Sequence, residues 1–169
     1  MSRQHPSECE KEMNSQNGQK YVAVIGGGEA EATALGLAYK VGQELARRGA
    51  VLICGGLGGV MRAAAQGAQE AGGVTIGILP GADRRAANMF LTFSLATNLG
   101  HARNMVIAHS ADGLIAIDGS YGTISEAAIA LKLGKPVVGL KVKWQLEGMK
   151  MAARPEEAVE LIWREVGGS

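Results

Sequence analysis

Short, uninterrupted apolar runs alternate along this chain with longer segments that repeat apolar residues every three or four positions, and this alternation constrains the fold most. An unbroken apolar run is typical of a strand buried on both faces of a sheet, and the longer period is typical of an amphipathic helix. The predicted strands are Tyr21–Ile25, Val51–Cys54, Val74–Leu79, Gly113–Ile117 and Pro136–Val142. The predicted helices run from Leu35 to a stop at Gly49 and over Val60–Ala71, Ala102–His109, Thr123–Leu133 and Pro155–Val166.

Strands that alternate with helices over the whole length predict an α/β fold with a doubly wound parallel sheet. Right-handed crossovers would place helices on both faces, giving a Rossmann-like arrangement of three αβα layers. We expect one domain over residues 19–169, preceded by a mobile, polar extension over residues 1–18. The pattern is weakest between Pro80 and Leu99, where we expect a loop up to Asn88 and a short strand within Phe90–Thr97.

Composition narrows the class of partner. Of the 169 residues, 47% are hydrophobic but only 4% are aromatic, so Ala, Val, Ile and Leu must fill the core. The net charge is +1 and no basic stripe occurs, which argues against nucleic acid or a membrane surface and favours a small ligand. The two cysteines, Cys9 and Cys54, form neither a disulfide framework nor a metal-ligand pattern. We expect a cytoplasmic protein without a signal peptide or transmembrane helix.

The segment Asp118–Glu126 lies between a predicted buried strand and a predicted helix. Unpaired backbone amides and the positive end of the helix dipole converge at such a helix start. Two glycines in the segment permit close approach, and the hydroxyl groups of Ser120 and Thr123 can add hydrogen bonds, so a phosphate is the expected occupant. Glu126 is three residues beyond Thr123, so it should share that helix face and reach a sugar beside the phosphate.

The same segment also admits a purely structural interpretation. Ser120 or Thr123 would then cap the helix, and Glu126 would complete a capping box. We favour the ligand site, because two further glycine-rich turns, Gly26–Gly28 and Gly55–Gly59, also follow predicted strands. All three turns should meet at the carboxyl edge of a parallel sheet, where such folds bind ligands.

The turn after the first strand does not complete a dinucleotide motif. Gly26 and Gly28 match the first two glycines of G-x-G-x-x-G, but the third position is Glu31. No acidic residue ends the second strand, where Cys54 leads straight into the next turn. A nicotinamide cofactor is therefore not expected, and no other resident cofactor is predicted.

The turn Gly55–Gly59 places four glycines around one leucine, two residues ahead of Met61. So many glycines lose much backbone entropy on folding unless something must approach them closely. A base or pterin ring lying on the turn and tight packing of the turn on a neighbouring strand explain it equally well.

Arg103 and Asn104 lie near a predicted helix start at the same edge of the sheet. A guanidinium group there can pair with a phosphate or a carboxylate, although a helix-surface arginine taken alone is more often a solvated charge. His101 and His109 lack a metal-ligand spacing, so we interpret both as surface or packing residues and predict no metal site.

Taken together, the segments Gly55–Met61, Ala102–Asn104 and Asp118–Glu126 resemble the Lonely-Guy-like (LOG-like) family, over about residues 20–142. The family signature P-G-G-x-G-T-x-x-E is matched at Gly119, Tyr121, Gly122, Thr123 and Glu126. The G-G-x-x-G-x-M loop that precedes it is matched at Gly55, Gly56, Gly59 and Met61. Asp118 replaces the proline and Ser120 the second glycine. This shorter pattern is closer to the branch that includes molybdenum-cofactor carrier proteins.

The resemblance implies two alternative functions. In the enzyme branch, the N-glycosidic bond of a nucleoside 5′-monophosphate is hydrolysed, and Arg103 and Glu126 would be the catalytic residues. In the carrier branch, the protein binds molybdenum cofactor or a similar phosphorylated ring without turnover. The resemblance also implies at least a homodimer. The candidate ligand-binding residues are Gly26, Gly27, Gly55, Gly56, Gly59, Met61, Asn104, Gly119, Ser120, Tyr121, Gly122 and Thr123.

Overall fold

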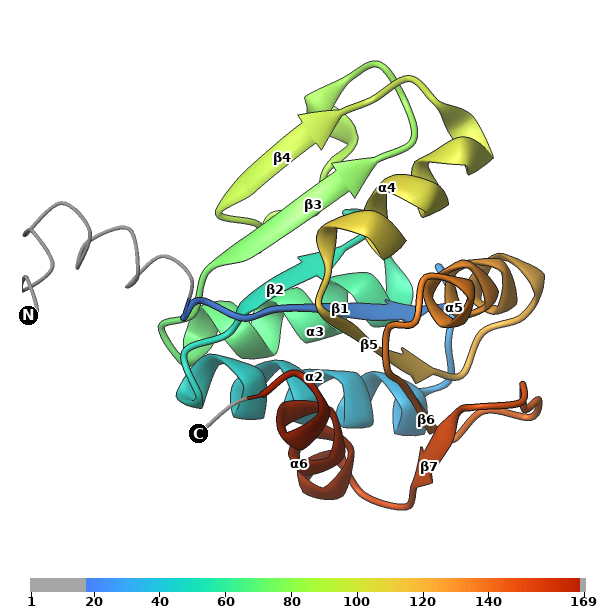
Figure 1. The fold of residues 1–169 in the computed structure, drawn as a ribbon. Helices are drawn as coiled ribbons and strands as arrows, with labels where there is room; N and C mark the ends of the chain where they lie inside the picture. Colours follow the sequence, from blue (N-terminus) through green and yellow to red (C-terminus); the bar gives the residue numbers. More distant parts are fainter. Residues whose placement is uncertain (1–17, 168–169) are drawn as a thin grey trace, which may run out of the picture.

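The computed structural model describes residues 18–167. The predicted extension over residues 1–18 therefore lies outside the described residues, except for Gly18. In the described part, seven strands form one sheet in which all neighbouring strands are parallel, with helices on both faces (Figure 1). The predicted Rossmann-like α/β fold is confirmed.

The elements follow the predicted alternation closely. The strands are β1 (Tyr21–Gly26), β2 (Val51–Cys54), β3 (Thr75–Leu79), β4 (Phe93–Ala96), β5 (Gly113–Ile117), β6 (Val137–Leu140) and β7 (Lys150–Ala152). The helices are α2 (Ala32–Arg47), α3 (Gly59–Glu70), α4 (Arg103–Ser110), α5 (Tyr121–Lys132) and α6 (Pro155–Glu165), with short 3-10 helices η1 (Arg84–Ala86) and η2 (Gly100–Ala102).

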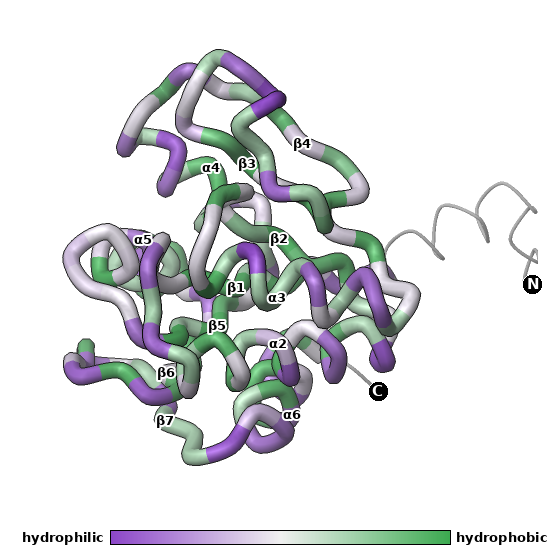
Figure 2. Tube along the Cα trace, turned by 180° about the vertical axis from the view of Figure 1, so that it is seen from behind, coloured by the Kyte–Doolittle hydropathy of each residue, from purple (hydrophilic) through white to green (hydrophobic). Residues whose placement is uncertain are grey.

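The core has two layers because successive side chains of each strand point to opposite faces of the sheet. Val22 and Val24 of β1 pack in the layer formed with α2, α3 and α6. Ala23 and Ile25 pack in the layer formed with α4 and α5. Figure 2 shows the resulting hydrophobic character along β1, β2 and β5 at the centre of the molecule.

Helices α2 and α3 approach each other closely because glycines stand at their contact. A Cβ atom on Gly42 would collide with the backbone of Ala64, and one on Gly67 would collide with the backbone of Tyr39. The small residues of these two helices therefore serve packing within the chain.

The strand order is β4-β3-β2-β1-β5-β6-β7. The chain winds outward from β1 in one direction, returns, and then winds outward from β5 in the other. This reversal makes the β1/β5 boundary a topological switch point, where the turns at the carboxyl ends leave a crevice. The turns after β1, β2 and β5 meet there, as expected from the sequence.

Two edge strands show the limits of the pattern. The short strand predicted within Phe90–Thr97 is β4. The sequence does not indicate β7, because a three-residue edge strand with mostly exposed side chains needs no apolar run. Within the described residues, no helix is long and apolar enough to span a membrane.

Candidate ligand-binding site

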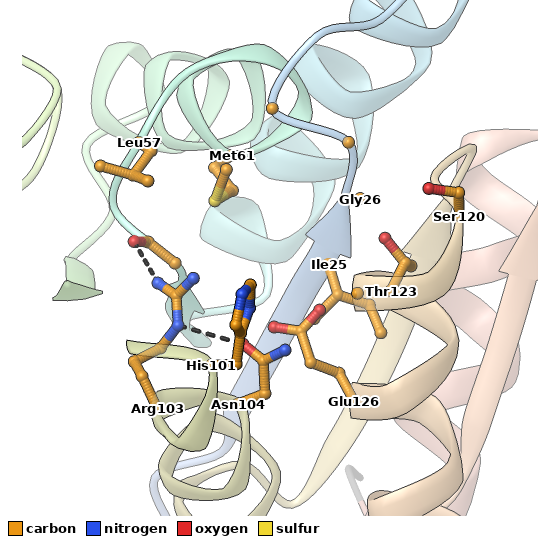
Figure 3. A pocket seen from close by; sticks show the side chains of 14 residues that line it. Ile25, Gly26, Leu57, Met61, His101, Arg103, Asn104, Ser120, Thr123 and Glu126 are labelled. Atoms are coloured by element: carbon orange, nitrogen blue, oxygen red, sulfur yellow. Dashed lines mark hydrogen bonds between the residues drawn. The ribbon is translucent and has the colours of Figure 1, made fainter. Parts of the chain in front are cut away.

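A cavity of about 290 Å³ opens at the switch point between β1 and β5 (Figure 3). Its walls come from the turns after β1 and β2, from η2 and the start of α4, and from the first turns of α5. This volume suits one ring with a phosphate better than a dinucleotide. The lining residues are Ile25, Gly26, Gly27, Gly28, Gly55, Leu57, Met61, His101, Arg103, Asn104, Ser120, Gly122, Thr123 and Glu126.

The start of α5 presents open hydrogen-bond donors to this cavity. Ser120 occupies the N-cap position, but no side chain caps the helix. The predicted alternative of a capping box is therefore wrong. The first amides of a helix have no acceptor within the helix, so they remain free to bind an anion. Gly122 faces open space, since a Cβ atom added there would meet nothing within 4 Å.

Arg103 is tied into the wall of the cavity by hydrogen bonds to main-chain oxygens. Its Nη1 donates to the carbonyl oxygens of Gly55 (2.6 Å) and Ile78 (2.5 Å), and its Nε donates to Oδ1 of Asn104 (3.1 Å). This guanidinium group therefore holds the turn after β2 against β3 and α4. Burial lowers the pKa of Arg103, and the carboxyl group of Glu126 opposes this shift.

Asn104 connects this arginine to the anion-binding end of α5. Its Nδ2 donates to Oγ of Ser125 (3.1 Å), and that hydroxyl donates to the carbonyl oxygen of Gly122 (2.7 Å). The buried amide group thus uses its donor and its acceptor at once, and it fixes α4 relative to the first turn of α5.

Glu126 lies at the floor of the cavity and is only 7% exposed. No hydrogen bond or ion pair within residues 18–167 engages its carboxyl group, which opens toward the cavity (Figure 3). All side-chain polar atoms in that range that are fully buried do have a partner. Burial raises the pKa of Glu126 to about 7, and the positive charge of Arg103 opposes this shift.

The glycines of the turn after β2 serve packing. Gly56 has φ of +79° and lies against the side chain of Leu79, and Gly59 has φ of +60° and lies against the backbone of Gly27 and Gly28. A Cβ atom on Gly55 would meet Sδ of Met61 and Nη1 of Arg103. Of the two explanations for this turn, the structure favours close packing for these three glycines.

Most of the predicted site residues line the cavity. Those that do are Gly26, Gly27, Gly55, Met61, Arg103, Asn104, Ser120, Gly122, Thr123 and Glu126. Gly56 and Gly59 do not, because neighbouring elements cover them. Gly119 does not line it either; this glycine has φ of +83° and lies against the side chain of Thr123. Tyr121 also lies outside the lining, 87% exposed on the outer side of α5.

Other residues in or near the cavity wall are not among the predicted ligand-binding residues. His101, which the sequence indicates as a surface or packing residue, is exposed and lies at the mouth of the cavity. Leu57, the lone leucine of the glycine turn, also borders the cavity together with Ile25 and Gly28. Trp144, from the loop between β6 and β7, donates its indole N–H to the carbonyl oxygen of Gly119 (3.2 Å). Only the sheet topology brings this tryptophan to the turn after β5.

Asp118, which replaces the proline of the family signature, is an acidic residue at the start of the segment before α5. It lies outside the cavity lining and has φ of +52°. Within residues 18–167, no group of three or more His, Cys, Asp or Glu side chains is placed to hold a metal ion.

The fold and the site define a Rossmann-like α/β protein with a small-ligand cavity at the switch point of its sheet. The SLOG cluster4 family matches residues 19–164, and the chain belongs to this family.

The chain is also similar to several known proteins. An uncharacterised protein of Archaeoglobus fulgidus is 51% identical over 138 residues, which cover 82% of this chain and 91% of that protein. The structure of the molybdenum cofactor binding protein from Rippkaea orientalis is similar with a TM-score of 0.82 and 39% identity, covering 86% of this chain and 96% of that one. The Moco carrier protein from Chlamydomonas reinhardtii is similar with a TM-score of 0.81 and 32% identity, covering 89% and 99%.

Proposed function

We propose that this protein binds and carries a phosphorylated ring ligand of pterin type, such as molybdenum cofactor, without turning it over. The observation that carries this proposal is the uncapped start of α5 in the wall of a cavity at the carboxyl edge of the sheet. An anion is stabilised there by free amides and by the helix dipole. The similar solved structures described as molybdenum cofactor binding or carrier proteins support the same ligand class.

The cavity has separate surfaces for the two parts of such a ligand. Gly122 and Thr123 lie at the phosphate end, where the glycine leaves room for close approach. Leu57 and Met61 supply an apolar wall, and a methionine sulfur makes favourable contacts with flat rings. A ring against this wall with its phosphate at α5 uses both surfaces at once.

The proposal is tested by loading the full chain in a bacterial host that makes molybdenum cofactor. The purified protein is analysed for molybdenum by mass spectrometry and for bound pterin by fluorescence after oxidation. We expect near-stoichiometric pterin on the wild type. Pterin and molybdenum no higher than on an unrelated protein purified in parallel would overturn the proposal.

A second candidate is hydrolysis of nucleoside 5′-monophosphates to the free base and ribose 5-phosphate. Glu126 favours it, because its unpartnered carboxyl group faces the cavity one turn beyond the phosphate end and has a pKa of about 7. Such a group can stabilise positive charge that develops on the ribose and can orient water. Arg103 has fewer free donors for this reaction, because it is engaged by main-chain oxygens.

The two candidates differ in turnover. Incubation of the pure protein with a panel of nucleoside 5′-monophosphates releases free base only if the protein is a hydrolase, and Glu126→Ala would then abolish the release. If the wild type releases no base above background, the hydrolase candidate is wrong, and the carrier proposal is unaffected.

We further infer that a second copy of the chain covers the outer part of the sheet at β4. Phe93 and Leu95 are paired in register with Ile76 and Ile78, so they point to the face of α4. They are nevertheless 60% and 54% exposed. Light scattering coupled to gel filtration should show a dimer or larger assembly, and Phe93→Lys should shift it toward monomer. A monomeric wild type at micromolar concentration would contradict this inference.

A further inference from the structure

The proposed function leaves open how the cavity would distinguish one ring from another. Two of the polar side chains that line it, Asn104 and Arg103, are already engaged by neighbouring groups. The side-chain oxygen of Asn104 accepts a hydrogen bond from Arg103, and its nitrogen donates one to Ser125. Arg103 donates from Nη1 and Nε to neighbouring groups.

The hydroxyl groups of Ser120 and Thr123 lie at the phosphate end, and His101 lies at the mouth. Beside them, free hydrogen-bonding capacity is left in the carboxyl group of Glu126 and in Nη2 of Arg103, which has no partner within residues 18–167.

These two groups provide acceptors and a donor on the same floor. The carboxylate of Glu126 offers two acceptor oxygens, and Nη2 of Arg103 offers a donor. They are electrostatically coupled, since each shifts the pKa of the other, yet they form no ion pair. A ring edge that carries two adjacent N–H donors followed by a carbonyl oxygen complements them. Guanine and pterin share this 2-amino-4-oxo-pyrimidine edge, whereas adenine has no ring N–H there and no carbonyl oxygen.

We propose that Glu126 is the specificity-determining residue of the cavity and selects rings with the 2-amino-4-oxo-pyrimidine edge, while Nη2 of Arg103 donates a hydrogen bond to the ring carbonyl oxygen. This inference rests on the proposed phosphate and ring binding at the same site. Glu126 is 7% exposed and unpartnered, so its carboxylate is costly to bury alone. A ring with two N–H donors supplies the missing hydrogen bonds, and a ring without them leaves the carboxyl group unsatisfied.

GMP, IMP and AMP test this selection because they share ribose and phosphate and differ only at the ring edge. Isothermal titration of the full chain at pH 8 should give the order GMP, IMP, AMP from tightest to weakest. A buried site built for hydrogen bonds rejects a ligand that lacks them strongly, so we expect at least about a tenfold gap between GMP and AMP. IMP keeps one of the two N–H donors and should fall between them.

Glu126→Gln replaces one acceptor with a donor at the same volume. GMP affinity should fall about tenfold, while AMP affinity should stay the same or rise, because an amide complements adenine. A structural role alone would weaken all three nucleotides together. Glu156→Gln, an exposed acid on α6, is the matched control and should leave the order unchanged.

Two results would overturn the inference. Equal affinities of the wild type for the three nucleotides would do so and would leave phosphate binding standing. Loss of binding to all three would also overturn it, and the proposed function would then be decided separately by the pterin bound in the loading experiment.

Discussion

The turn after β2 and the turn after β5 both lead at the carboxyl edge of the sheet into a helix with a glycine in its first turn. In the first, Gly56 and Gly59 are covered by neighbouring side chains and backbone, and the amide of Val60 at the start of α3 donates to the carbonyl oxygen of Gly27 (3.0 Å). In the second, Gly122 faces open space and no side chain caps α5. The first turn is closed, and the second is open.

The titratable side chains beneath the two turns also differ: one is enclosed in the core, and the other faces the cavity. Cys54 beneath the closed turn is fully buried, and burial raises the pKa of its thiol to about 11, so it stays neutral. Glu126 beneath the open turn has a pKa of about 7 and faces the cavity. A glycine-rich turn therefore indicates only that some group approaches the backbone closely. The space around each glycine in the folded protein decides whether that group is a neighbouring segment or a ligand.

The largest expected effect comes from filling the closed turn. In Gly59→Ala, the new Cβ atom collides with the backbone of Gly27 and Gly28, and the positive φ is strained for alanine. Strain and overpacking together should lower the free energy of unfolding by about 3 kcal/mol, measured by urea denaturation. A loss near zero would show that the closed turn has room to move.

The next effect concerns the carboxyl group beneath the open turn. Because the pKa of Glu126 is raised from 4.5 to about 7, the folded protein holds this proton over a range where the unfolded chain has lost it. The stability that the protonated carboxyl group of Glu126 contributes to the fold is therefore fully present below pH 4.5 and is lost as the pH rises through 7. Between pH 4.5 and 8, the wild type should lose on the order of 2 to 3 kcal/mol relative to Glu126→Gln.

Urea denaturation of both proteins at the two pH values measures this difference directly. Arg103, whose charge acts on this carboxyl group, stays protonated over the range. The thiol of Cys54, with its pKa raised to about 11, stays neutral. Parallel pH dependence in the two proteins would mean that Glu126 is ionised in the fold well below pH 7.

A smaller effect is expected from filling the open turn. Gly122→Ala adds a methyl group where no atom lies within 4 Å, so the fold should keep or gain up to about 1 kcal/mol from helix propensity. The same methyl group obstructs the approach of a phosphate, so GMP affinity should fall about tenfold, or roughly 1.4 kcal/mol.

Gly36→Ala is the matched control for this variant. Gly36 lies in α2, away from the cavity, and also has nothing within 4 Å of an added Cβ atom. It should gain similar stability without a change in affinity. Unchanged affinity in Gly122→Ala would separate the open turn from phosphate binding.

The smallest expected effect concerns the support of the open turn. Trp144→Phe removes the hydrogen bond to the carbonyl oxygen of Gly119 and keeps most of the ring. We expect a loss of about 1 kcal/mol in the free energy of unfolding. A loss of GMP affinity of a few fold should accompany it, because the turn is less fixed. An affinity equal to that of the wild type would show that the turn holds its shape without Trp144.

The sequence by itself determined the class of fold and the edge where the site lies. Unbroken apolar runs such as Gly113–Ile117 require burial on both faces, and their alternation with helices admits a parallel sheet with covered faces. Parallel strands bring their carboxyl ends to one edge, so the turns after β1, β2 and β5 had to meet there. These conclusions depend on local pattern and chain connectivity alone.

The tertiary structure alone decided what each residue in those turns does. Arg103 binds the carbonyl oxygen of Gly55, 48 positions away, and Trp144 reaches Gly119 across the β6–β7 loop. Whether a glycine is covered, as Gly59 is, or open, as Gly122 is, depends on such distant neighbours. The unpartnered carboxyl group of Glu126 has the same origin, because burial and hydrogen-bond partners arise only when elements far apart in the sequence pack together.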